Sequence, residues 1–207
     1  MTAVTTPVTR RYSGMDRESE LDLVRRLRDG DAQAFDVVYE TFNGRLFTFL
    51  ARLMRSRARA EDLLEETWLR LVAHADRLHP DTRLGPWLFT VARNLHASYW
   101  RSLMLEEACA DGPGLWPVAS ARSPFEETAA NELERRVEAA LAALPVSHRE
   151  VLLLIAVEGL DQSEAANICG ISATAFRQRL KRARDLLAKR LDESARPARG
   201  VLREVNP

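Results

Sequence analysis

The chain has 207 residues, and because 30 are Lys or Arg and 30 are Asp or Glu, its formal net charge is zero. This length suits one or two small domains, and 29% charged with 7% aromatic residues is typical of a helix-rich globular protein. The longest apolar run, residues 151–157, is too short to cross a bilayer, which excludes membrane insertion, and the N-terminus lacks the apolar core of a secretory signal. We therefore expect a cytoplasmic protein.

Residues 1–18 lack apolar periodicity and are expected to form a disordered tail. Three apolar sets with helical spacing follow: Leu21, Val24 and Leu27; Ala34, Phe35, Val38, Tyr39 and Phe42; and Leu46, Phe49, Leu50 and Leu53. Gly30-Asp31 separates the first two sets, and Asp31 is available as an N-cap. Asn43-Gly44 is either a break or a tolerated interruption between the second and third sets.

A further helix is predicted from about Ala60, with Leu64, Trp68, Leu71, Val72 and Ala75 on its packed side. Its other side carries Asp62, Glu65, Glu66 and Leu69. Such an acidic strip is either plain solvated surface or a face for a basic protein partner.

The next helix begins near Gly85-Pro86, because proline is favoured in a first turn. No acidic residue occurs from Thr82 to Leu105, while the stretch contains Arg83, Trp87, Arg93, Asn94, His96, Tyr99, Trp100 and Arg101. Arginines interleaved with aromatic rings suit unpaired nucleic acid, since arginines hold phosphates and rings stack on bases. The alternative places Trp87, Leu88, Val91 and Leu95 in the core, which we expect, and leaves Trp100 open between the two interpretations.

Residues 105–123 contain prolines, glycines and small residues without a period, which predicts a linker. Ser123-Pro124 then marks a helix start, and the apolar positions Leu133, Val137, Leu141 and Leu144 continue that helix to Pro145. An apolar helix over 147–158 should form the core of a second domain. The predicted organisation is a first domain over 19–104, a second over 124–193 and a disordered tail over 194–207.

The segment 159–191 predicts two helices joined by a tight turn. Asp161 and Glu164 form a capping-box pattern for a short helix through Cys169, and Gly170 ends it by taking the left-handed conformation. Ser172 is the next N-cap candidate, so the second helix should begin near Ala173. The packed side of the pair is Ala165, Ile168, Ile171, Phe176, Leu180, Ala183 and Leu187, which leaves Thr174, Arg177, Gln178, Lys181, Arg182 and Arg184 facing outward.

Residues 172–190 hold seven basic residues against one acid, a local excess of six in a chain with no net charge. A helix-turn-helix can present such a face to the major groove of DNA. A basic amphipathic helix alone is as often only solvated surface, but the short helix, the glycine turn and the N-cap together favour the DNA-binding interpretation.

Four segments in this order resemble the extracytoplasmic-function (ECF) sigma factors of the sigma-70 family. In the first domain they are RDGDAQAFDVVYE, AEDLLEETWLRLV and PWLFTVARNLHASYWR, and the fourth runs from LAALPVSHREVLLLIAVEG through the helix-turn-helix to RARDLL. The resemblance covers most of residues 20–191. It implies an all-α fold of two small helical domains, the sigma region 2 bundle and the sigma region 4 helix-turn-helix, joined by a flexible linker.

The resemblance also implies a protein that carries no catalytic residue and no cofactor, initiates transcription in the manner of stress-response regulators, and binds core RNA polymerase through its β′ clamp helices and β flap. The polymerase-binding residues would be Asp62, Glu65, Glu66 and Leu69, where Glu65 replaces the family's usual glutamine. An anti-sigma factor that wedges between the two domains is a further implied partner.

Promoter DNA would be bound both as single strand and as duplex. For the flipped bases of the −10 element the resemblance implies the loop residues His79, Asp81, Thr82 and Arg83 and the helix residues Arg93, Asn94, Trp100 and Arg101. For the −35 element it implies Arg177, Gln178 and Lys181 at base edges, with Ser172, Thr174, Arg179, Arg182 and Arg184 beside them. Where the family has Gly-Thr-Val, this chain has Thr174-Ala175-Phe176 after Ala173, which puts the docking angle of the helix in question.

Two other readings compete with this one. A sigma-like decoy or a polymerase-independent helix-turn-helix regulator would be a binding protein of another kind, but a decoy should have lost residues such as Arg93 and Arg177. An enzyme or metal site built on His74, Asp76 and His79 is disfavoured, because the two histidines lack the spacing that shares a helix face. Cys109 and Cys169 likewise show no metal-ligand spacing.

Overall fold

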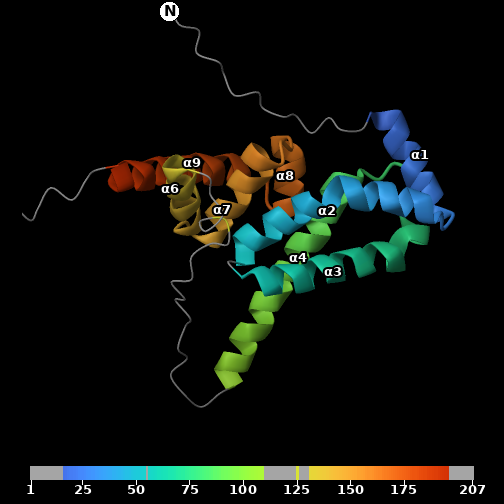
Figure 1. Ribbon diagram of the computed structural model, residues 1–207, viewed down its shortest axis with the longest axis horizontal. Helices are drawn as coiled ribbons and strands as arrows, with labels where there is room; N and C mark the ends of the chain where they lie inside the picture. The colour runs from blue at the N-terminus through green and yellow to red at the C-terminus, as the bar shows by residue number, and fades with distance from the viewer. Residues whose placement is uncertain (1–15, 55, 110–124, 126–130, 196–207) are drawn as a thin grey trace, which may run out of the picture.

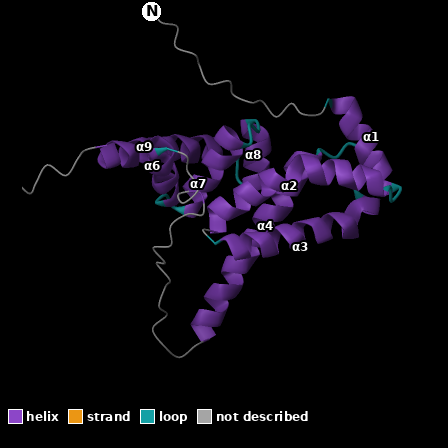
Figure 2. Cartoon of the chain, viewed as in Figure 1, coloured by secondary structure: helices purple, strands orange, loops and turns teal. Residues whose placement is uncertain are grey.

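The computed structural model describes residues 16–54, 56–109, 125 and 131–195, and every regular element in these ranges is helical (Figure 1), as the view coloured by secondary structure also shows (Figure 2). The helices are α1 (Arg17–Arg28), α2 (Ala32–Met54), α3 (Arg57–His74), η1 (Ala75–Arg77), α4 (Leu84–Cys109), α6 (Glu132–Ala142), α7 (Val146–Leu152), η2 (Leu153–Val157), α8 (Gln162–Cys169) and α9 (Ala173–Ala195). The all-α prediction is confirmed. The predicted helix start at Ser123, most of the predicted linker and nearly all of both predicted tails lie outside the described residues, so the domain boundaries stay predictions.

Helices α1 to α4 form the first bundle. Helix α2 passes through Asn43-Gly44 without a break, because Gly44 keeps helical geometry and its carbonyl also accepts a hydrogen bond from the Thr48 hydroxyl at 2.7 Å. Ser56 caps α3 by accepting a hydrogen bond from the Arg59 amide at 3.5 Å, so this helix begins three residues before the predicted start.

Helices α6 to α9 form the second bundle, in which α9 packs on α6, α7 and α8. The predicted helix over 147–158 begins one residue earlier and ends in a π-helical turn, η2. In that turn the Glu158 amide donates to the Leu153 carbonyl at 2.9 Å. Gly159 then takes a φ of 66°, and the chain enters α8.

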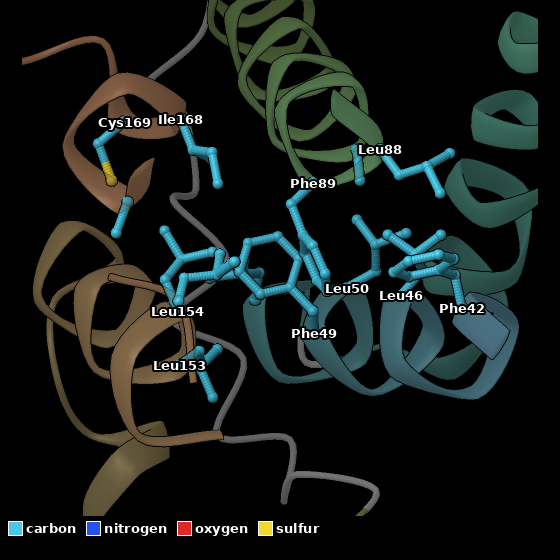
Figure 3. Close-up of a cluster of buried hydrophobic side chains, with 14 of the residues drawn as sticks. Phe42, Leu46, Phe49, Leu50, Leu88, Phe89, Leu153, Leu154, Ile168 and Cys169 are labelled. Carbon is cyan, nitrogen blue, oxygen red and sulfur yellow. The ribbon is translucent and has the colours of Figure 1, made fainter. Parts of the chain in front are cut away.

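The two bundles close against each other. Helix α4 packs on α8 and α2 packs on α7, so the buried residues form one continuous cluster. Within it the Phe49 and Phe89 rings meet edge to face at 5.3 Å, and the cluster continues into the second bundle through Leu154 and Ile168 (Figure 3). Each fully buried large apolar side chain here contributes about 2 kcal/mol, so closure is supported by a substantial apolar contact.

Arg149 of α7 joins the ends of two helices, one from each bundle. Its side chain is 3% exposed and donates hydrogen bonds to five backbone carbonyls: Arg52 O at 2.8 Å, Leu53 O at 3.4 Å, Leu141 O at 3.1 Å, Ala142 O at 2.7 Å and Leu144 O at 2.9 Å. The last carbonyls of a helix lack intrahelical partners and carry its partial negative charge. At the C-terminal ends of α2 and α6, the buried Arg149 guanidinium therefore donates hydrogen bonds to these carbonyls and compensates their partial negative charge.

Two ion pairs flank this arginine at the junction. Arg52 of α2 meets Glu138 of α6 at 2.6 Å, and Arg45 of α2 meets Glu158 at 2.9 Å. Burial raises the pKa of the Glu158 carboxyl above its usual value, and the Arg45 guanidinium opposes that rise. The bundles are thus held by charge pairs around an apolar centre.

Four residues predicted to pack in the core are exposed instead. Val72 of α3 is 61% exposed and Tyr39 of α2 is 41% exposed, because the apolar side of these helices is wider than the surface that their neighbours cover. Leu133 and Val137 of α6 are also exposed, at 65% and 36%. The prediction was wrong for these four, and two of them line a groove described below.

Candidate nucleic-acid and protein interfaces

The helix-turn-helix has the geometry that its sequence predicts. Asp161 accepts hydrogen bonds from the amides of Ser163 and Glu164 at 2.8 Å, and its own amide donates to the Glu164 carboxylate at 3.4 Å. These bonds lower the pKa of Asp161. Gly170 is left-handed with a φ of 65°, and the Ser172 hydroxyl accepts from the Ala175 amide at 3.2 Å, so α9 begins at Ala173. The capping-box, turn and N-cap predictions are confirmed.

The outward side of α9 carries the predicted basic residues. Ser172, Thr174, Arg177, Gln178, Lys181, Arg182 and Arg184 are exposed, and Arg179 is half-buried. The Arg177 guanidinium donates to the Thr174 hydroxyl at 3.2 Å, which orients it along the first turn. Phe176, the larger ring noted in the sequence, is fully buried and helps to fix α9 on its support.

The positive field of this face extends to α7. Burial lowers the pKa of His148, and Arg179 and Arg182 lower it further by repulsion. The histidine is therefore kept neutral beside these two arginines. A cluster of this kind concentrates positive potential where a phosphate backbone would lie.

The predicted single-strand residues of the first bundle are divided between solvent and the second bundle. Asn94 and Arg101 are exposed, whereas Arg93 pairs with Glu150 of α7 at 3.0 Å. Arg83 pairs with Glu164, the capping-box acid of α8. Burial raises the pKa of Glu164, and Arg83 opposes that rise. The second bundle thus occupies two of the arginines predicted to bind DNA.

Trp100 is half-buried, and its indole nitrogen donates to His96 Nε2 at 3.0 Å. That bond requires His96 to be neutral at Nε2. Burial lowers the pKa of His96 to about 4, with Arg93 as the second cause. The Trp100 side chain therefore contributes to the first bundle through its hydrogen bond to His96, while part of its ring remains at the surface.

A groove of about 210 Å³ runs between α3 and α4 beside Asn94. Its lining residues are Arg70, His74, Trp87, Val91, Asn94, Leu95 and Ser98. Leu88 is fully buried as predicted, but Trp87, Val91 and Leu95 are only half-buried, so they form the wall of this groove rather than the centre of the core. An amide, a cation and a ring around one concave surface suit an unstacked base.

The loop between η1 and α4 presents the other predicted residues. His79 and Asp81 are exposed, and Thr82 is half-buried. The Thr82 amide donates to the His79 carbonyl at 2.9 Å, and the Asp81 amide contacts His79 Nδ1 at 3.2 Å. The loop is a compact turn whose side chains face outward.

The predicted acidic strip of α3 borders an apolar groove of about 340 Å³. Asp62 and Glu65 are exposed, Glu66 is half-buried, and Leu69 is 56% exposed. The strip is partly neutralised, because Asp62 pairs with Arg59 at 3.4 Å and Glu66 pairs with Arg70 at 2.9 Å. Glu65 and Leu69 line the groove itself.

The aromatic floor of that groove was not predicted from the sequence. Tyr39 lies 4.9 Å from the Trp68 ring, and Phe35 meets Trp68 edge to face at 5.8 Å. The Trp68 indole donates to the Asn43 side chain at 3.0 Å. Helix α2 carries more apolar positions than one packed face needs. This surplus was the signal in the sequence for an additional apolar surface. An open apolar groove with an acidic rim suits a helix with apolar and basic side chains.

Among the described residues no cluster of His, Cys, Asp and Glu has the geometry of a metal site. Cys169 is a buried free thiol, and burial raises its pKa to about 12, with Glu150 as the second cause. No helix in the described part of the chain is long and apolar enough to cross a membrane.

Comparisons with known proteins identify the family of the chain. The family models described as Sigma-70 region 2 and Sigma-70, region 4 match residues 38–104 and 134–187. The ECF RNA polymerase sigma factor EcfG of Rhodopseudomonas palustris is 37% identical over 143 residues, which is 69% of this chain and 77% of that protein. The RNA polymerase sigma factor CarQ of Myxococcus xanthus is 35% identical over 170 residues, or 82% of this chain and 96% of that protein.

The chain is also similar to solved structures. The sigma factor RpoE in complex with the anti-sigma factor NepR from Bartonella quintana superposes with a TM-score of 0.65 at 28% identity, covering 80% of this chain and all of that one. CnrH in complex with the cytosolic domain of CnrY has the same fold, with a TM-score of 0.64 at 23% identity, covering 85% and 99% of the two chains. With both sigma-70 regions in order and relatives at this level of identity, the chain belongs to the ECF sigma factors of the sigma-70 family.

Proposed function

We propose that this sigma factor binds core RNA polymerase through the groove and acidic rim on α2 and α3, reads the −10 element with α4 and the loop before it, and reads the −35 element with α9. The observation that carries the proposal is the outward face of α9, where Arg177, Gln178 and Lys181 are exposed on a helix that a complete capping box and glycine turn hold in place. Arginine donates bidentately to guanine, so Arg177 is the principal base-reading candidate.

The polymerase-binding part of the proposal rests on complementarity. The groove offers the Tyr39 and Trp68 rings and Leu69, while Glu65 supplies a carboxylate at its edge. Because the carboxylates of Asp62 and Glu66 are shared with neighbouring arginines, we assign most of the binding free energy to the apolar floor and to Glu65. The expected β-flap contact would be made by the second bundle.

The −10 part of the proposal rests on Asn94 and the groove beside it. The exposed Asn94 amide, which lines the same groove as the Trp87 ring, can hydrogen-bond one flipped base while the ring supports it. Arg101 adds charge along α4. Flipping a base costs a few kcal/mol, which binding to the groove would offset, and the polymerase supplies all covalent chemistry.

The proposed DNA binding requires that the two bundles separate. Arg83 and Arg93 cannot hold phosphates while they are paired with Glu164 and Glu150. We infer that the bundles separate when polymerase binds, which frees both arginines. A partner that stabilises the closed form would keep the protein inactive, and the similarity to a sigma factor solved with its anti-sigma factor supports an inhibitor of that class. A protein that works on polymerase and promoter acts in the cytoplasm.

The experiment is run-off transcription with core polymerase on a pool of promoter fragments. It compares the wild type with Arg177→Ala, the double variant Glu65→Ala/Leu69→Ala and Lys189→Ala as a matched control, since Lys189 is an exposed cation near the far end of α9. Loss of the Arg177 contact should cost about 1–3 kcal/mol of discrimination at one −35 base. The double variant should lose polymerase binding, and Lys189→Ala should behave as the wild type.

The alternatives remain measurable outcomes. If the wild type binds promoter DNA but not polymerase, it is a polymerase-independent regulator. If it binds neither after removal of any co-purified inhibitor, the decoy reading replaces the proposal.

A further inference from the structure

The first turn of α1 contacts a segment more than sixty residues further along the chain. Arg17 Nη2 donates to the Asp81 carbonyl at 2.8 Å, and Arg17 Nη1 lies 3.5 Å from the Thr82 carbonyl. The carboxylate of Glu20 accepts a hydrogen bond from the Leu84 amide at 2.9 Å. Together these contacts span the end of the loop and the first residue of α4.

The local sequence builds this arrangement. Asp16 caps α1 by accepting from the Ser19 amide at 3.0 Å, which fixes the turn that carries Arg17 and Glu20. The two side chains are three positions apart on one helix face and pair at 2.8 Å. Each therefore holds the other against the loop.

Glu20 is placed as a capping group for another helix. It is only 7% exposed, although charged side chains are rarely buried without partners. Its two partners are the Arg17 guanidinium and the Leu84 amide, one of the first amides of α4 without an intrahelical acceptor. A carboxylate at a helix N-terminus also interacts favourably with the helix dipole. Glu20 thus fixes where α4 starts.

The loop has two further sets of contacts: the bonds around His79 described above and, at its end, the ion pair of Arg83 with Glu164. The side chains of His79 and Asp81 are exposed. The carbonyls held by Arg17 belong to Asp81 and Thr82. The backbone at these two residues is therefore set by α1, while their side chains are left for another molecule.

We propose that Arg17 and Glu20 are positioning residues for the −10 element, because they hold the base-reading loop in register with α4. The inference rests on the proposed function of that loop. Neither residue touches DNA in this assignment, and each acts through the backbone of 81–84.

The test uses holoenzyme assembled from core polymerase and the full chain, with a duplex DNA library randomised over the two promoter elements. Bound fragments are sequenced for the wild type, Arg17→Ala, Glu20→Gln and the control Arg25→Ala, an exposed arginine that pairs within α1 with Asp22. Polymerase affinity and the melting temperature are measured in parallel. Glu20→Gln keeps an oxygen for the Leu84 amide and so separates loss of charge from loss of fold.

Preference for the wild-type −10 bases should fall about fivefold in Arg17→Ala, as expected for loss of charge-assisted bonds at a partly exposed site, and by about twofold in Glu20→Gln. The −35 preference, the polymerase affinity and the Arg25→Ala profile should not differ measurably from those of the wild type. Unchanged −10 selection in both variants would overturn the proposal. Equal loss of both elements, or of polymerase binding, would also overturn it by showing a purely structural role. Failure of the wild type to select any −10 sequence would instead overturn the proposed function.

Discussion

The Arg93–Glu150 ion pair makes closure of the two bundles testable by one isosteric change, Glu150→Gln. The pair joins α4 to α7 at 3.0 Å, and its side chains are 27% and 7% exposed. An amide can still accept the hydrogen bond from Arg93 but carries no charge. The loss should therefore lie between that of an exposed ion pair and that of a buried charged hydrogen bond, about 1–2 kcal/mol of closure.

This free energy corresponds to a shift of about fivefold to thirtyfold toward the open form. In the isolated protein, the affinity for a single-stranded −10 oligonucleotide should rise within that range, because Arg93 becomes available to phosphate. The radius of gyration from small-angle X-ray scattering should increase at the same time. The control is Glu193→Gln, which removes a carboxylate that pairs with Lys189 and Arg190 within α9.

Two results would refute this reasoning. Unchanged oligonucleotide affinity together with unchanged scattering would mean that the apolar contact alone sets closure. A rise in affinity that Glu193→Gln reproduces would mean that only the overall charge of the protein matters.

Three further predictions concern stability. Arg149→Met leaves backbone carbonyls at two helix ends without their buried cation. We expect the free energy of unfolding to fall by about 3–5 kcal/mol and the melting temperature by about 6–20 °C, with a smaller loss in Arg149→Lys. A change in melting temperature under about 2 °C would contradict this. Gly170→Ala should cost about 1–2 kcal/mol in urea unfolding, because no atom lies within 4 Å of an added Cβ and only the left-handed backbone is strained; a neutral result would refute that cause. The pKa of His96 is lowered to about 4, so the unfolded chain binds its proton first and stability falls as pH drops from about 6.5 toward 4. From pH 7 to pH 5 the wild type should lose about 2 kcal/mol that His96→Gln does not lose; Glu158 and Glu164, with raised pKa values, act with the opposite sign above about 4.5 in both proteins.

The helix-turn-helix could be predicted almost residue by residue because its signals are local. A capping box spans four residues, a left-handed turn needs one glycine, and the outward face of α9 follows from helical spacing. The structure confirms the cap at Asp161, the turn at Gly170 and the exposure of Arg177. Their roles toward DNA stay predictions that the transcription experiment tests.

Predictions about apolar residues succeeded only where a helix has neighbours along its whole length. Helical spacing identifies an apolar stripe, but how much of it is covered depends on which helices pack there. Val72 and Tyr39 share their stripes with fully buried residues, yet they remain exposed because α2 and α3 leave a groove between them. The aromatic floor of this groove, where we propose that polymerase binds, was therefore visible in the sequence only as ordinary core.

By itself the sequence determined the helical class, the caps of the helix-turn-helix, the order of the two sigma regions and the basic face of α9, because these depend on residues within a few positions of one another. Tertiary structure alone decided that Arg93 meets Glu150, that Arg83 meets Glu164 and that Arg17 reaches the loop at Asp81. These partners lie tens of residues apart, and a charged residue on a helix surface has no local preference for one distant partner over another. Packing of the two bundles selects these partners, and it thereby places Arg83 and Arg93, which were predicted to bind DNA, in ion pairs with the second bundle.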